Sequence, residues 1–428
     1  MKDLFKSIIK ESQERKITDI KQRLLTIPVD IPLIVSLIGA RRSGKTYLLF
    51  SIIKQLVESG IPRKNILYLN FEDERLNLQT SDLDIIIQAY CELYPEIKLN
   101  DCYFLFDEIQ NVEGWEKFIR RIFDTQTKNI FITGSNSKLL SSEIATSLRG
   151  RTVTYTIYPL SLNEYLQFKN IDIDLIHPQK KAKLIYHTSQ FIHNGGFPEV
   201  VNFDQEIRLR LLQSYFNTMI FRDIIERYKV SDAVMLKFFI KKIFAGIGKP
   251  LSINKIYKDL RSMNYKVSNN YLYDFEEYCN TVFLSVTVPK FDYSEIKQEK
   301  ADKKVYSIDT GLLSAIEFTV SENRGKLLEN MVLLEFVKLG YEVFYFKEKY
   351  ECDFIIKKQK KLFPIQVSYV LEKDKSKERE IRGLLEACNR INVNEGTIIT
   401  FDQKDEFIQQ GVNIKVIPVY QYFLEIHS

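Results

Sequence analysis

An eight-residue loop near the N-terminus has the residue types and spacing of a phosphate site. The segment Gly39–Thr46 reads G-x-x-x-x-G-K-T, and it lies between the apolar run Ile34–Ile38 and a helix-like run that starts at Tyr47. Glycines permit backbone conformations in which successive N–H groups turn toward phosphate oxygens, and a helix N-terminus adds a positive partial charge. Lys45 would reach the outer phosphates of a nucleotide, and Thr46 would ligate Mg²⁺. The further residues that would bind the nucleotide here are Gly39, Arg42, Ser43 and Gly44.

A second motif supports this interpretation of the loop. The run Tyr103–Phe106 predicts a buried strand, and Asp107 and Glu108 stand together at its carboxyl end. Carboxylate oxygens suit Mg²⁺, and an anionic acceptor can polarise a water molecule. Asp107 would therefore hold Mg²⁺ through its water shell, and Glu108 would activate the attacking water. A glycine-rich turn and an acidic strand end can each occur by chance, but together they favour ATP binding and hydrolysis.

Two more polar positions follow later strands, and each has a second interpretation. Ser135 or Asn136, after the fourth predicted strand, could contact the γ-phosphate or position water, but either could equally cap the next helix. Arg151, just before the fifth strand, could stabilise transition-state charge in the site of a neighbouring subunit. The alternative for Arg151 is a surface salt bridge.

Length and composition exclude several classes of protein. A chain of 428 residues predicts two to four domains, and its apolar fraction of 45% is ordinary. No apolar run approaches the ~18 residues of a membrane span, and the N-terminus lacks a signal peptide, so we expect a cytoplasmic protein without membrane contact. The five cysteines form no C-x-x-C pair, and the four histidines complete no metal-ligand pattern. The net charge of +5 is too mild to argue for nucleic acid.

Residues 31 to about 160 alternate between strand and helix patterns. Such alternation predicts a parallel sheet flanked by helices, in which ligands bind at the carboxyl ends of the strands. Both nucleotide motifs fall at such ends. The predicted strands are Ile31–Gly39, Asn65–Glu72, Tyr103–Ile109, Asn129–Ser135 and Thr152–Pro159, with helical patterns over Asp82–Tyr94 and Trp115–Thr125 and one or two helices within residues 1–30.

The rest of the chain changes character twice. Residues 160–245 are helical in pattern, with a turn at Gly195–Glu199, and 250–310 predict two short helices and then two strands. The Lys-rich stretch 296–304 predicts an exposed linker or hairpin loop. From 325 onward a helix, three strands, another helix and two last strands indicate a separate α/β domain.

These motifs resemble the AAA-type ATPases of archaea and bacteria that carry an extra C-terminal domain of unknown function. Besides the nucleotide motifs, the resemblance rests on Ile132–Ser135, Leu148–Arg151, Tyr158–Tyr165, Gly195–Glu199, Phe221–Ile224 and Tyr306–Gly311, and it covers nearly the whole chain. It implies an α/β protein with four parts. These are a P-loop AAA-type ATPase domain with an N-terminal helix at 1–160, a helical lid at 161–248, a winged helix at 249–320, and a restriction-endonuclease-like domain at 321–428.

The winged helix suggests DNA as a partner, but its composition argues against groove recognition. The second helix, Ser268–Cys279, contains three acids and no Lys or Arg, so it would bring negative charge toward phosphates. The wing loop is the better candidate for a phosphate contact. Its lysines are Lys290, Lys297, Lys300, Lys303 and Lys304, and the alternative is a solvated hairpin.

The C-terminal domain resembles a nuclease that has lost its activity. Glu329, Asp353 and Gln366-Val367-Ser368 look like the E…D…(E/Q)-x-K arrangement of restriction-endonuclease-like folds. There, acids bind Mg²⁺ and the lysine activates water. Ser368 supplies no cation in the place of that lysine, and Gln366 is a weaker ligand than a carboxylate. Lys347 or Lys349 could take the role of the missing lysine, although nothing in the sequence shows that either does.

Three functions remain open from the sequence. The first is an ATPase whose nucleotide cycle moves the C-terminal domains, with DNA or a protein as its target. The second is a nucleotide-switched binding module with negligible turnover, and the third is an ATP-dependent nuclease. Glu108 favours the first over the second, and Ser368 argues against the third. A role for Arg151 in a neighbouring site would also require a homo-oligomer.

Overall fold

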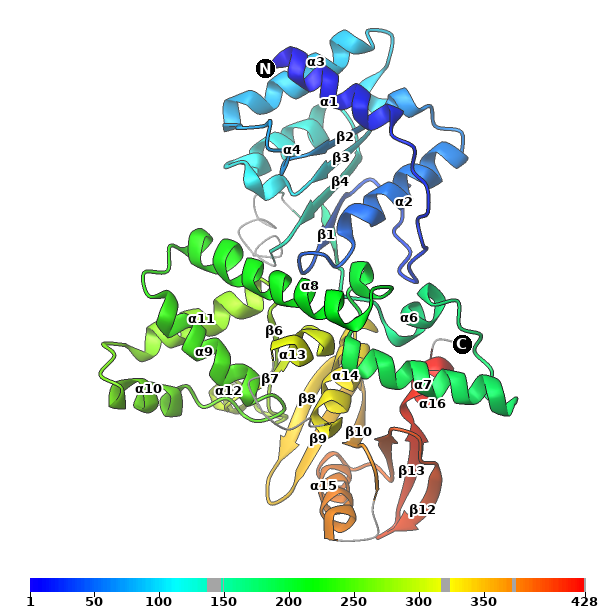
Figure 1. Cartoon of the computed structure of the whole chain (residues 1–428), viewed down its shortest axis with the longest axis vertical. Coiled ribbons are helices and arrows are strands. Elements are labelled where there is room, and N and C mark those ends of the chain that lie inside the picture. The colour runs from blue at the N-terminus through cyan, green and yellow to red at the C-terminus, as the bar shows by residue number, and fades with distance from the viewer. Residues whose placement is uncertain (137–147, 149, 317–323, 372–374, 427–428) are drawn as a thin grey trace. The chain divides into compact units, whose positions relative to one another are not determined.

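The computed structural model describes residues 1–136, 148, 150–316, 324–371 and 375–426. It consists of two compact units, residues 1–157 and 158–428, and each is described by itself (Figure 1).

The first unit is built on a five-stranded parallel sheet, as the alternating pattern predicts. Its strands are β1 (Ile34–Ile38), β2 (Ile66–Asn70), β3 (Tyr103–Asp107), β4 (Asn129–Gly134) and β5 (Thr152–Thr156). Their order across the sheet is β2-β3-β4-β1-β5, and every neighbouring pair is parallel. Because β4 lies between β1 and β3, the end of β4 stands between the loop that follows β1 and the acids that end β3.

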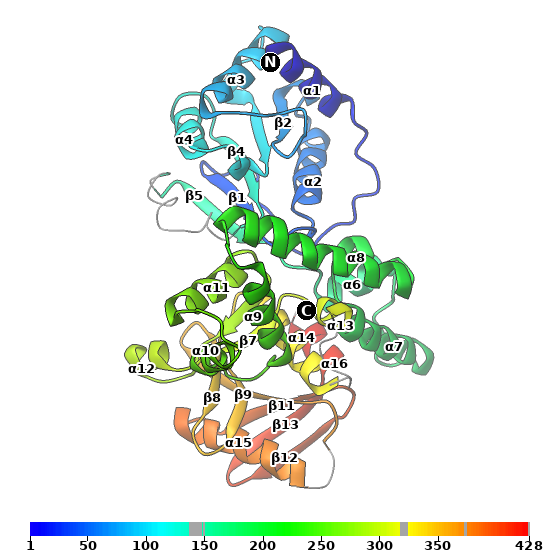
Figure 2. The ribbon, with the colours of Figure 1, turned by 60° about the vertical axis from the view of Figure 1, so that its left-hand side comes forward.

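Helices cover both faces of this sheet (Figure 2). They are α1 (Lys2–Glu14), α2 (Lys45–Glu58), α3 (Leu83–Leu93) and α4 (Trp115–Thr125), with single 3₁₀ turns at Arg63–Asn65, Thr80–Asp82, Leu99–Asp101 and Ile109–Asn111. The apolar side of α2 packs in one core with Val35 and Leu37 of β1. On the other face, aromatic rings of α3 and α4 contact Phe104 and Phe106 of β3. Residues 1–30 contain one helix, α1, and its residues Phe5, Ile8 and Ile9 are buried at the spacing of one helical face.

The second unit begins with helices, as predicted for residues 160–245. They are α6 (Leu162–Phe168), α7 (Pro178–Asn194), α8 (Gln205–Thr218), the π-helix Met219–Glu226 and α9 (Ala233–Ala245), with a 3₁₀ turn at Pro198–Val200. Gly195 ends α7 at φ +73°. The next amide, of Gly196, donates to Oδ2 of buried Asp309 at 2.7 Å, so two of the segments that carry the family resemblance meet here.

The middle of this unit contains the two helices and two strands expected between residues 250 and 310. They are α10 (Ile253–Ser262), α11 (Asn269–Thr281), β6 (Ser285–Val288) and β7 (Lys304–Ser307), followed by α13 (Thr310–Ile316). The two strands form an antiparallel hairpin. The prediction of an exposed loop at 296–304 is wrong in two respects. Residues Glu295–Lys300 form the short helix α12, and Lys304 is fully buried because its ammonium contacts carboxylates of the C-terminal sheet.

A six-stranded mixed sheet forms the C-terminal part. Its elements are α14 (Arg324–Lys338), β8 (Glu342–Lys347), β9 (Glu351–Lys358), β10 (Lys361–Ser368), α15 (Lys375–Ile391), β11 (Glu395–Thr400), β12 (Asp405–Gln409), β13 (Val412–Pro418) and α16 (Val419–Ile426). The strand order is β12-β13-β11-β10-β9-β8. Helix α15 packs on one face, while Phe336 of α14 contacts Phe354 of β9 and Phe423 of α16 on the other. The sequence pattern did not predict β12, because this strand is largely exposed and lacks an apolar face. It also did not predict the last helix, α16.

Candidate active site

The loop between β1 and α2 has the backbone shape that its glycines predict. Gly39 has φ +152° and Gly44 has φ +101°, conformations that residues with a Cβ rarely adopt. A Cβ at position 39 would lie 2.1 Å from the carbonyl oxygen of Ile157, so the close approach of two backbones also requires glycine there. Gly44 immediately precedes α2. The loop thus leads into a helix N-terminus, whose free N–H groups and dipole favour an anion.

The ammonium of Lys45 lies within this loop. Its Nζ donates to the carbonyl oxygens of Gly39 and Ala40, each at 3.1 Å, and it lies 3.3 Å from Oε1 of Glu108. The flexible stem of a lysine allows its ammonium to exchange such partners for phosphate oxygens.

Asp107 ends β3 and is bonded to three hydroxyl groups. Tyr68 of β2 donates to its Oδ2 at 3.0 Å, Thr133 of β4 donates to its Oδ1, and Thr46 also hydrogen-bonds to it. Burial raises the pKa of Asp107, and the charge of Glu108 adds to this effect, while the three hydrogen bonds oppose it. Thr46 and Asp107 are thus in contact, and both present the hard oxygen donors that Mg²⁺ prefers.

Glu108 has an unusual backbone and a fully engaged carboxylate. Its φ of +54° is in the left-handed region, and its N–H donates to the hydroxyl of Thr133 at 2.8 Å. Oε1 faces Lys45, while Oε2 accepts from Gln110 at 2.6 Å and from the amide of Ser135 at 3.1 Å. Burial acts to raise the pKa of Glu108, but Lys45 and Gln110 outweigh it and the net shift is downward. This carboxylate is therefore held ionised beside the loop.

Two buried hydroxyl groups near these acids support a polar ligand. The Oγ atoms of Ser43 and Ser135 have no hydrogen-bond partner within the part of the chain that the structure describes, and both side chains are buried. Such groups are costly unless an oxygen-rich ligand or water satisfies them. Together with Lys45, Thr46 and Asp107, they fit a nucleotide triphosphate with Mg²⁺. Asn136 is buried beside Ser135, and the prediction that either residue caps a following helix concerns residues 137–147, which lie outside the described residues.

Arg151 forms the surface salt bridge that was its alternative interpretation. Its guanidinium bonds to Asp124 of α4, and both side chains are about one-third exposed. Arg149, from the same motif, lies outside the described residues. A role for Arg151 in a neighbouring subunit remains a prediction.

The sequence motifs did not reveal three of the residues around this site. Tyr68 and Thr133 contact Asp107, and Arg41 pairs with Glu72 at 2.8 Å beside the loop. A hydroxyl in the apolar run Ile66–Leu69 is the signal that could have drawn attention to Tyr68.

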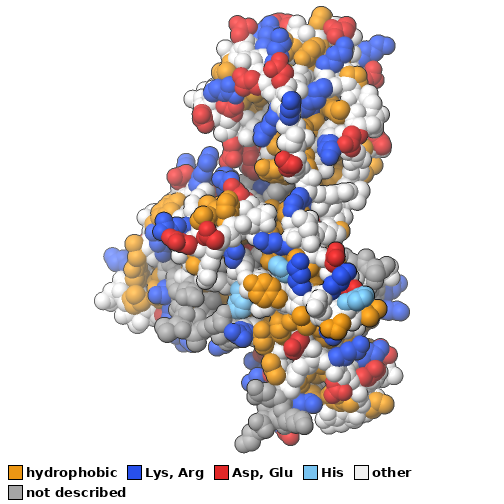
Figure 3. Space-filling view, turned by 45° about the vertical axis from the view of Figure 1, so that its right-hand side comes forward, with side chains coloured by type: hydrophobic (Ala, Val, Ile, Leu, Met, Phe, Trp, Pro, Cys, Tyr) orange, Lys and Arg blue, Asp and Glu red, His pale blue; other side chains and the backbone are white. Residues whose placement is uncertain are grey.

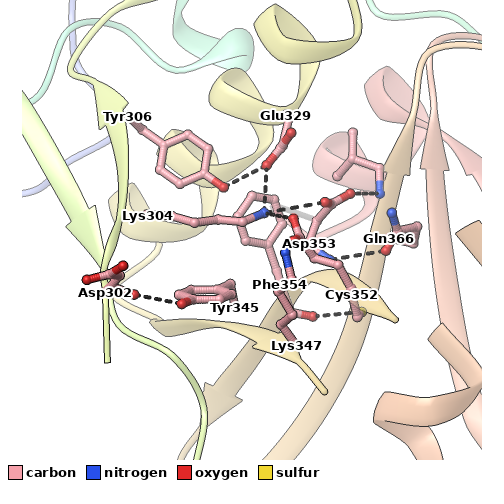
Figure 4. Close-up of polar contacts among 12 residues, drawn as sticks. Asp302, Lys304, Tyr306, Glu329, Tyr345, Lys347, Cys352, Asp353, Phe354 and Gln366 are labelled. Atoms are coloured by element: carbon pink, nitrogen blue, oxygen red, sulfur yellow. Dashed lines mark hydrogen bonds and ion pairs between the residues drawn. The ribbon is translucent and has the colours of Figure 1, made fainter. Parts of the chain in front are cut away.

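In the C-terminal sheet, three of the four predicted nuclease-like residues lie together and one does not. Glu329 of α14 and Asp353 of β9 both approach Lys304, and the amide of Asp353 donates to Oε1 of Gln366 at 3.1 Å (Figure 4). Ser368 instead donates its hydroxyl to the carbonyl oxygen of Val370 at 3.0 Å.

The cation at this cluster comes from an unexpected position. Lys304 lies 2.8 Å from Oε1 of Glu351, whereas the half-exposed Lys347 contacts only the outer oxygen of Glu351, at 3.0 Å. Lys349 points its ammonium at the ring of Tyr350. The buried cation of the cluster is thus Lys304, and not Lys347 or Lys349 as suggested from the sequence. Lys304 was not recognised because it stands in a Lys-rich stretch that was predicted to be exposed.

Two of the five lysines of the predicted wing contact acidic side chains. Lys304 is buried, and Lys303 pairs with Glu299 at 3.4 Å within the same segment. On the face of the molecule shown in Figure 3, Lys and Arg side chains lie among Asp and Glu side chains. No helix in the described ranges is long and apolar enough to cross a membrane.

Comparison with known proteins places this geometry in a family. An AAA domain model matches residues 32–166, and models of two domains of unknown function, DUF8612 and DUF4143, match 186–323 and 324–422. The uncharacterized protein MJ1544 of Methanocaldococcus jannaschii is 35% identical over 94% of this chain and 92% of its own length. The chain therefore belongs to the same family as MJ1544. An uncharacterized protein of Haemophilus influenzae is 34% identical over 77% of this chain and 81% of that protein.

The expected AAA-type ATPase with additional C-terminal domains is therefore confirmed in outline. The family combines an AAA P-loop domain, a class that binds ATP with Mg²⁺, with two domains of unknown function. Among solved structures, a Walker-type ATPase of Pyrococcus abyssi has a TM-score of 0.42 and 14% identity over 74% of this chain and 95% of its own. The Orc1 protein of Aeropyrum pernix, solved in complex with DNA, has a TM-score of 0.31 and 12% identity over 67% and 87%. Likenesses this low carry no argument about this chain.

Proposed function

We propose that this chain is a Mg²⁺-dependent ATPase whose catalytic centre is formed by the loop Gly39–Thr46 and the acids that follow β3. The observation that carries the proposal is the contact of Lys45 with Glu108 beside the contact of Thr46 with Asp107. These are a phosphate ligand, a candidate base and two metal-binding oxygens, and all of them lie in the first unit.

Each residue has a separate task in this proposal. Thr46 and Asp107 would hold Mg²⁺, which supplies charge neutralisation on the phosphates. The backbone N–H groups of the loop and the ammonium of Lys45 bind the phosphate oxygens, with Gly39, Arg42, Ser43 and Gly44 shaping the loop. Ser135 or Asn136 would contact the γ-phosphate or position the attacking water. Glu108 orients that water and accepts its proton.

Lys45 links ATP binding to the basicity of Glu108. The ammonium lies 3.3 Å from Glu108, so its transfer to phosphate oxygens removes the largest of the effects that lower the pKa of this carboxyl group. Loss of that cation makes Glu108 a stronger base. Glu108 therefore becomes more basic once Lys45 binds the phosphates of the nucleotide instead.

The remaining parts of the chain are proposed to respond to this cycle. We assign a helical lid to 161–248, a winged helix to 249–320 and a nuclease-like fold without nuclease activity to 321–428. Ser368 supports the loss of activity, because it is neutral and contacts Val370 instead of the acids. DNA, through the wing, or a protein is the proposed target of the motion, and a homo-oligomer would place Arg151 at a neighbouring site.

Steady-state phosphate release by the full chain tests the ATPase. With ATP and Mg²⁺, Glu108→Gln is expected to lower turnover about 10²–10⁴-fold and to retain ATP binding, since the amide keeps the shape but not the basicity. Equal release by both proteins at the background rate would refute hydrolysis, and binding without turnover would establish the nucleotide-switched module instead.

A further inference from the structure

The acidic cluster of the C-terminal sheet contains a cation of the chain itself. Lys304 of β7 is 0% exposed, and its Nζ lies 2.8 Å from Oε1 of Glu351. The same Nζ lies 3.4 Å from Oε1 of Glu329 and 3.7 Å from Oδ1 of Asp353 (Figure 4). A buried ammonium is tolerated only when carboxylates or other acceptors surround it. This position among carboxylates is also the one that a divalent cation would take in an acidic metal site.

We propose that the Lys304 ammonium is the permanent cation of the cluster of Glu329, Glu351 and Asp353. The cluster then joins the β6–β7 hairpin to the C-terminal sheet and does not bind a divalent metal. This inference is independent of the proposed ATPase. It deepens the proposed loss of nuclease activity, since it names what occupies the metal position.

The same strand makes two further contacts with α14. Tyr306 lies two residues beyond Lys304, on the same face of β7, and its hydroxyl donates to Oε1 of Glu329 at 2.6 Å. The amide of Ser307 donates to Oδ1 of Asn330 at 2.8 Å, and Nδ2 of Asn330 donates back to the carbonyl oxygen of Ser307 at 2.9 Å. Strand β7 is thus bonded to the C-terminal domain along most of its length.

The connection between the two hairpin strands is also attached, in this case to β8. Tyr345 donates its hydroxyl to the carbonyl oxygen of Asp302 at 2.6 Å and its amide to that of Pro289 at 3.0 Å. Its own carbonyl oxygen accepts from the amide of Phe291 at 2.7 Å. The ion cluster is therefore the centre of a continuous joint and not an isolated surface pair.

The other candidate metal ligands are already committed to protein groups. Oδ2 of Asp353 accepts from the amide of Val367 at 2.9 Å. Gln366 accepts from the amide of Asp353 through Oε1 and donates to Glu380 through Nε2. Across the described ranges, no group of three or more His, Cys, Asp or Glu side chains is arranged to hold a metal ion. The residues present thus fit an ammonium better than Mg²⁺.

The charges of the cluster agree with this assignment. Burial acts to lower the pKa of Lys304, but Glu329, Asp353 and Glu351 outweigh it and raise that pKa, so the amine stays charged. Burial and the charge of Glu329 raise the pKa of Asp353. Removal of Lys304 would leave Glu329, Glu351 and Asp353 without the buried ammonium that they share, and we expect the vacated position to attract another cation.

Titration of the full chain with Mn²⁺, without nucleotide, tests which cation the cluster takes. Wild type and Asp353→Asn are expected to bind the same number of Mn²⁺ ions. Lys304→Ala is expected to gain one ion, which is lost again in the double variant with Asp353→Asn. A wild-type Mn²⁺ ion that disappears in Asp353→Asn would overturn the proposal, as would a folded Lys304→Ala that gains none.

Hydrogen exchange of the β7 amides tests the joint, with the neighbouring lysine as a matched control. Lys304→Ala is expected to accelerate their exchange about 100-fold or more, because it leaves buried carboxylates without their cation. Lys303→Ala removes a partly exposed contact with Glu299 and should change exchange less than about fivefold. Equal exchange in the two variants would contradict the proposal. A Lys304→Ala chain that fails to fold would support the joint, and the wild-type Mn²⁺ titration would still test the cation.

Discussion

Lys45 and Lys304 are both buried lysines in contact with carboxylates, but they differ in the number of those carboxylates and in the hydrogen bonding of the polar groups around them. Among the described residues, Lys45 contacts one carboxylate, that of Glu108, and two loop carbonyls, and the neighbouring hydroxyl groups of Ser43 and Ser135 have no partner there. Lys304 contacts three carboxylates, and one of these residues, Asp353, also bonds to Val367 and Gln366.

The difference distinguishes a lysine that exchanges partners from one that is permanently bound. A ligand site needs an ammonium that can leave a weak set of partners and needs polar groups that the protein does not satisfy. A structural ion cluster needs the reverse, since an unpaired buried charge is costly. The same residue type beside the same kind of acid therefore indicates catalysis in one unit and cohesion in the other.

The largest expected contrast comes from matched changes of the two aspartates. Asp107→Asn should lower ATP turnover about 100-fold or more, because it weakens the metal-binding oxygens. Asp353→Asn should leave turnover within about twofold, since the described contacts of that side chain and its amide are with Lys304, Gln366 and Val367 of the second unit. Phosphate release measures both. A large loss in Asp353→Asn alone would remove the distinction between the two sites.

The next largest effects are expected from two tyrosines, one bonded to an acid of each site. Tyr68→Phe removes a hydroxyl bonded to Asp107 and should raise the Mg²⁺ concentration needed for half-maximal ATPase about tenfold or more. Tyr306→Phe removes a hydroxyl bonded to Glu329 and should cost about 1.5–3 kcal/mol of stability without altering that Mg²⁺ concentration. Mg²⁺ titrations and urea unfolding followed by circular dichroism separate the two effects. A shift of the Mg²⁺ requirement in Tyr306→Phe would contradict the structural role of that hydroxyl.

Acid titration gives a smaller effect with a definite sign. Burial acts to raise the pKa of Glu351, but Lys304 outweighs it and the net shift is downward. A carboxyl group with a lowered folded pKa stabilises the protein above its ordinary pKa, and this stability is lost as pH falls through the folded value. We expect Glu351→Gln to cost about 1 kcal/mol near neutral pH. The gap from wild type should close below the ordinary value of 4.5, as measured by unfolding at stepped pH. A gap that widens in acid would show that the pair is not formed.

The smallest expected effect is on the stability of Arg151→Ala. The pair with Asp124 is partly exposed, so its loss should cost less than about 1 kcal/mol. Activity is the informative quantity, because a role in a neighbouring subunit would lower turnover strongly despite the small change in stability. Molecular mass in solution with and without ATP and Mg²⁺ is the companion measurement. A monomer under both conditions would exclude that role.

The sequence predicted the first unit well because its signals are local. The glycines and Lys45 of Gly39–Thr46 have fixed spacing, and Asp107 and Glu108 directly follow an apolar strand, so neighbours in sequence are neighbours in the site. Tyr68 was not predictable in its role, because its contact with Asp107 depends on the register of two strands that lie far apart in the chain.

The sequence predicted the second unit less well because its central contacts are tertiary. Lys304 stands in a Lys-rich stretch, where composition indicates solvent exposure, and only the folded chain brings it to Glu329, 25 residues later. Burial and ion pairing overrode the local signal there. The absence of a lysine at position 368 was visible in the sequence, but the cation that occupies the cluster was not.

The central claim is that the exchangeable lysine is catalytic and the permanently bound one is structural. Phosphate release by Lys45→Met and Lys304→Met, measured with saturating ATP and Mg²⁺ below the melting temperature of both, tests this most directly. We predict that Lys45→Met loses about 100-fold or more of the wild-type rate, whereas Lys304→Met stays within about twofold. An active Lys45→Met, or a Lys304→Met that folds but hydrolyses no ATP, would contradict the account.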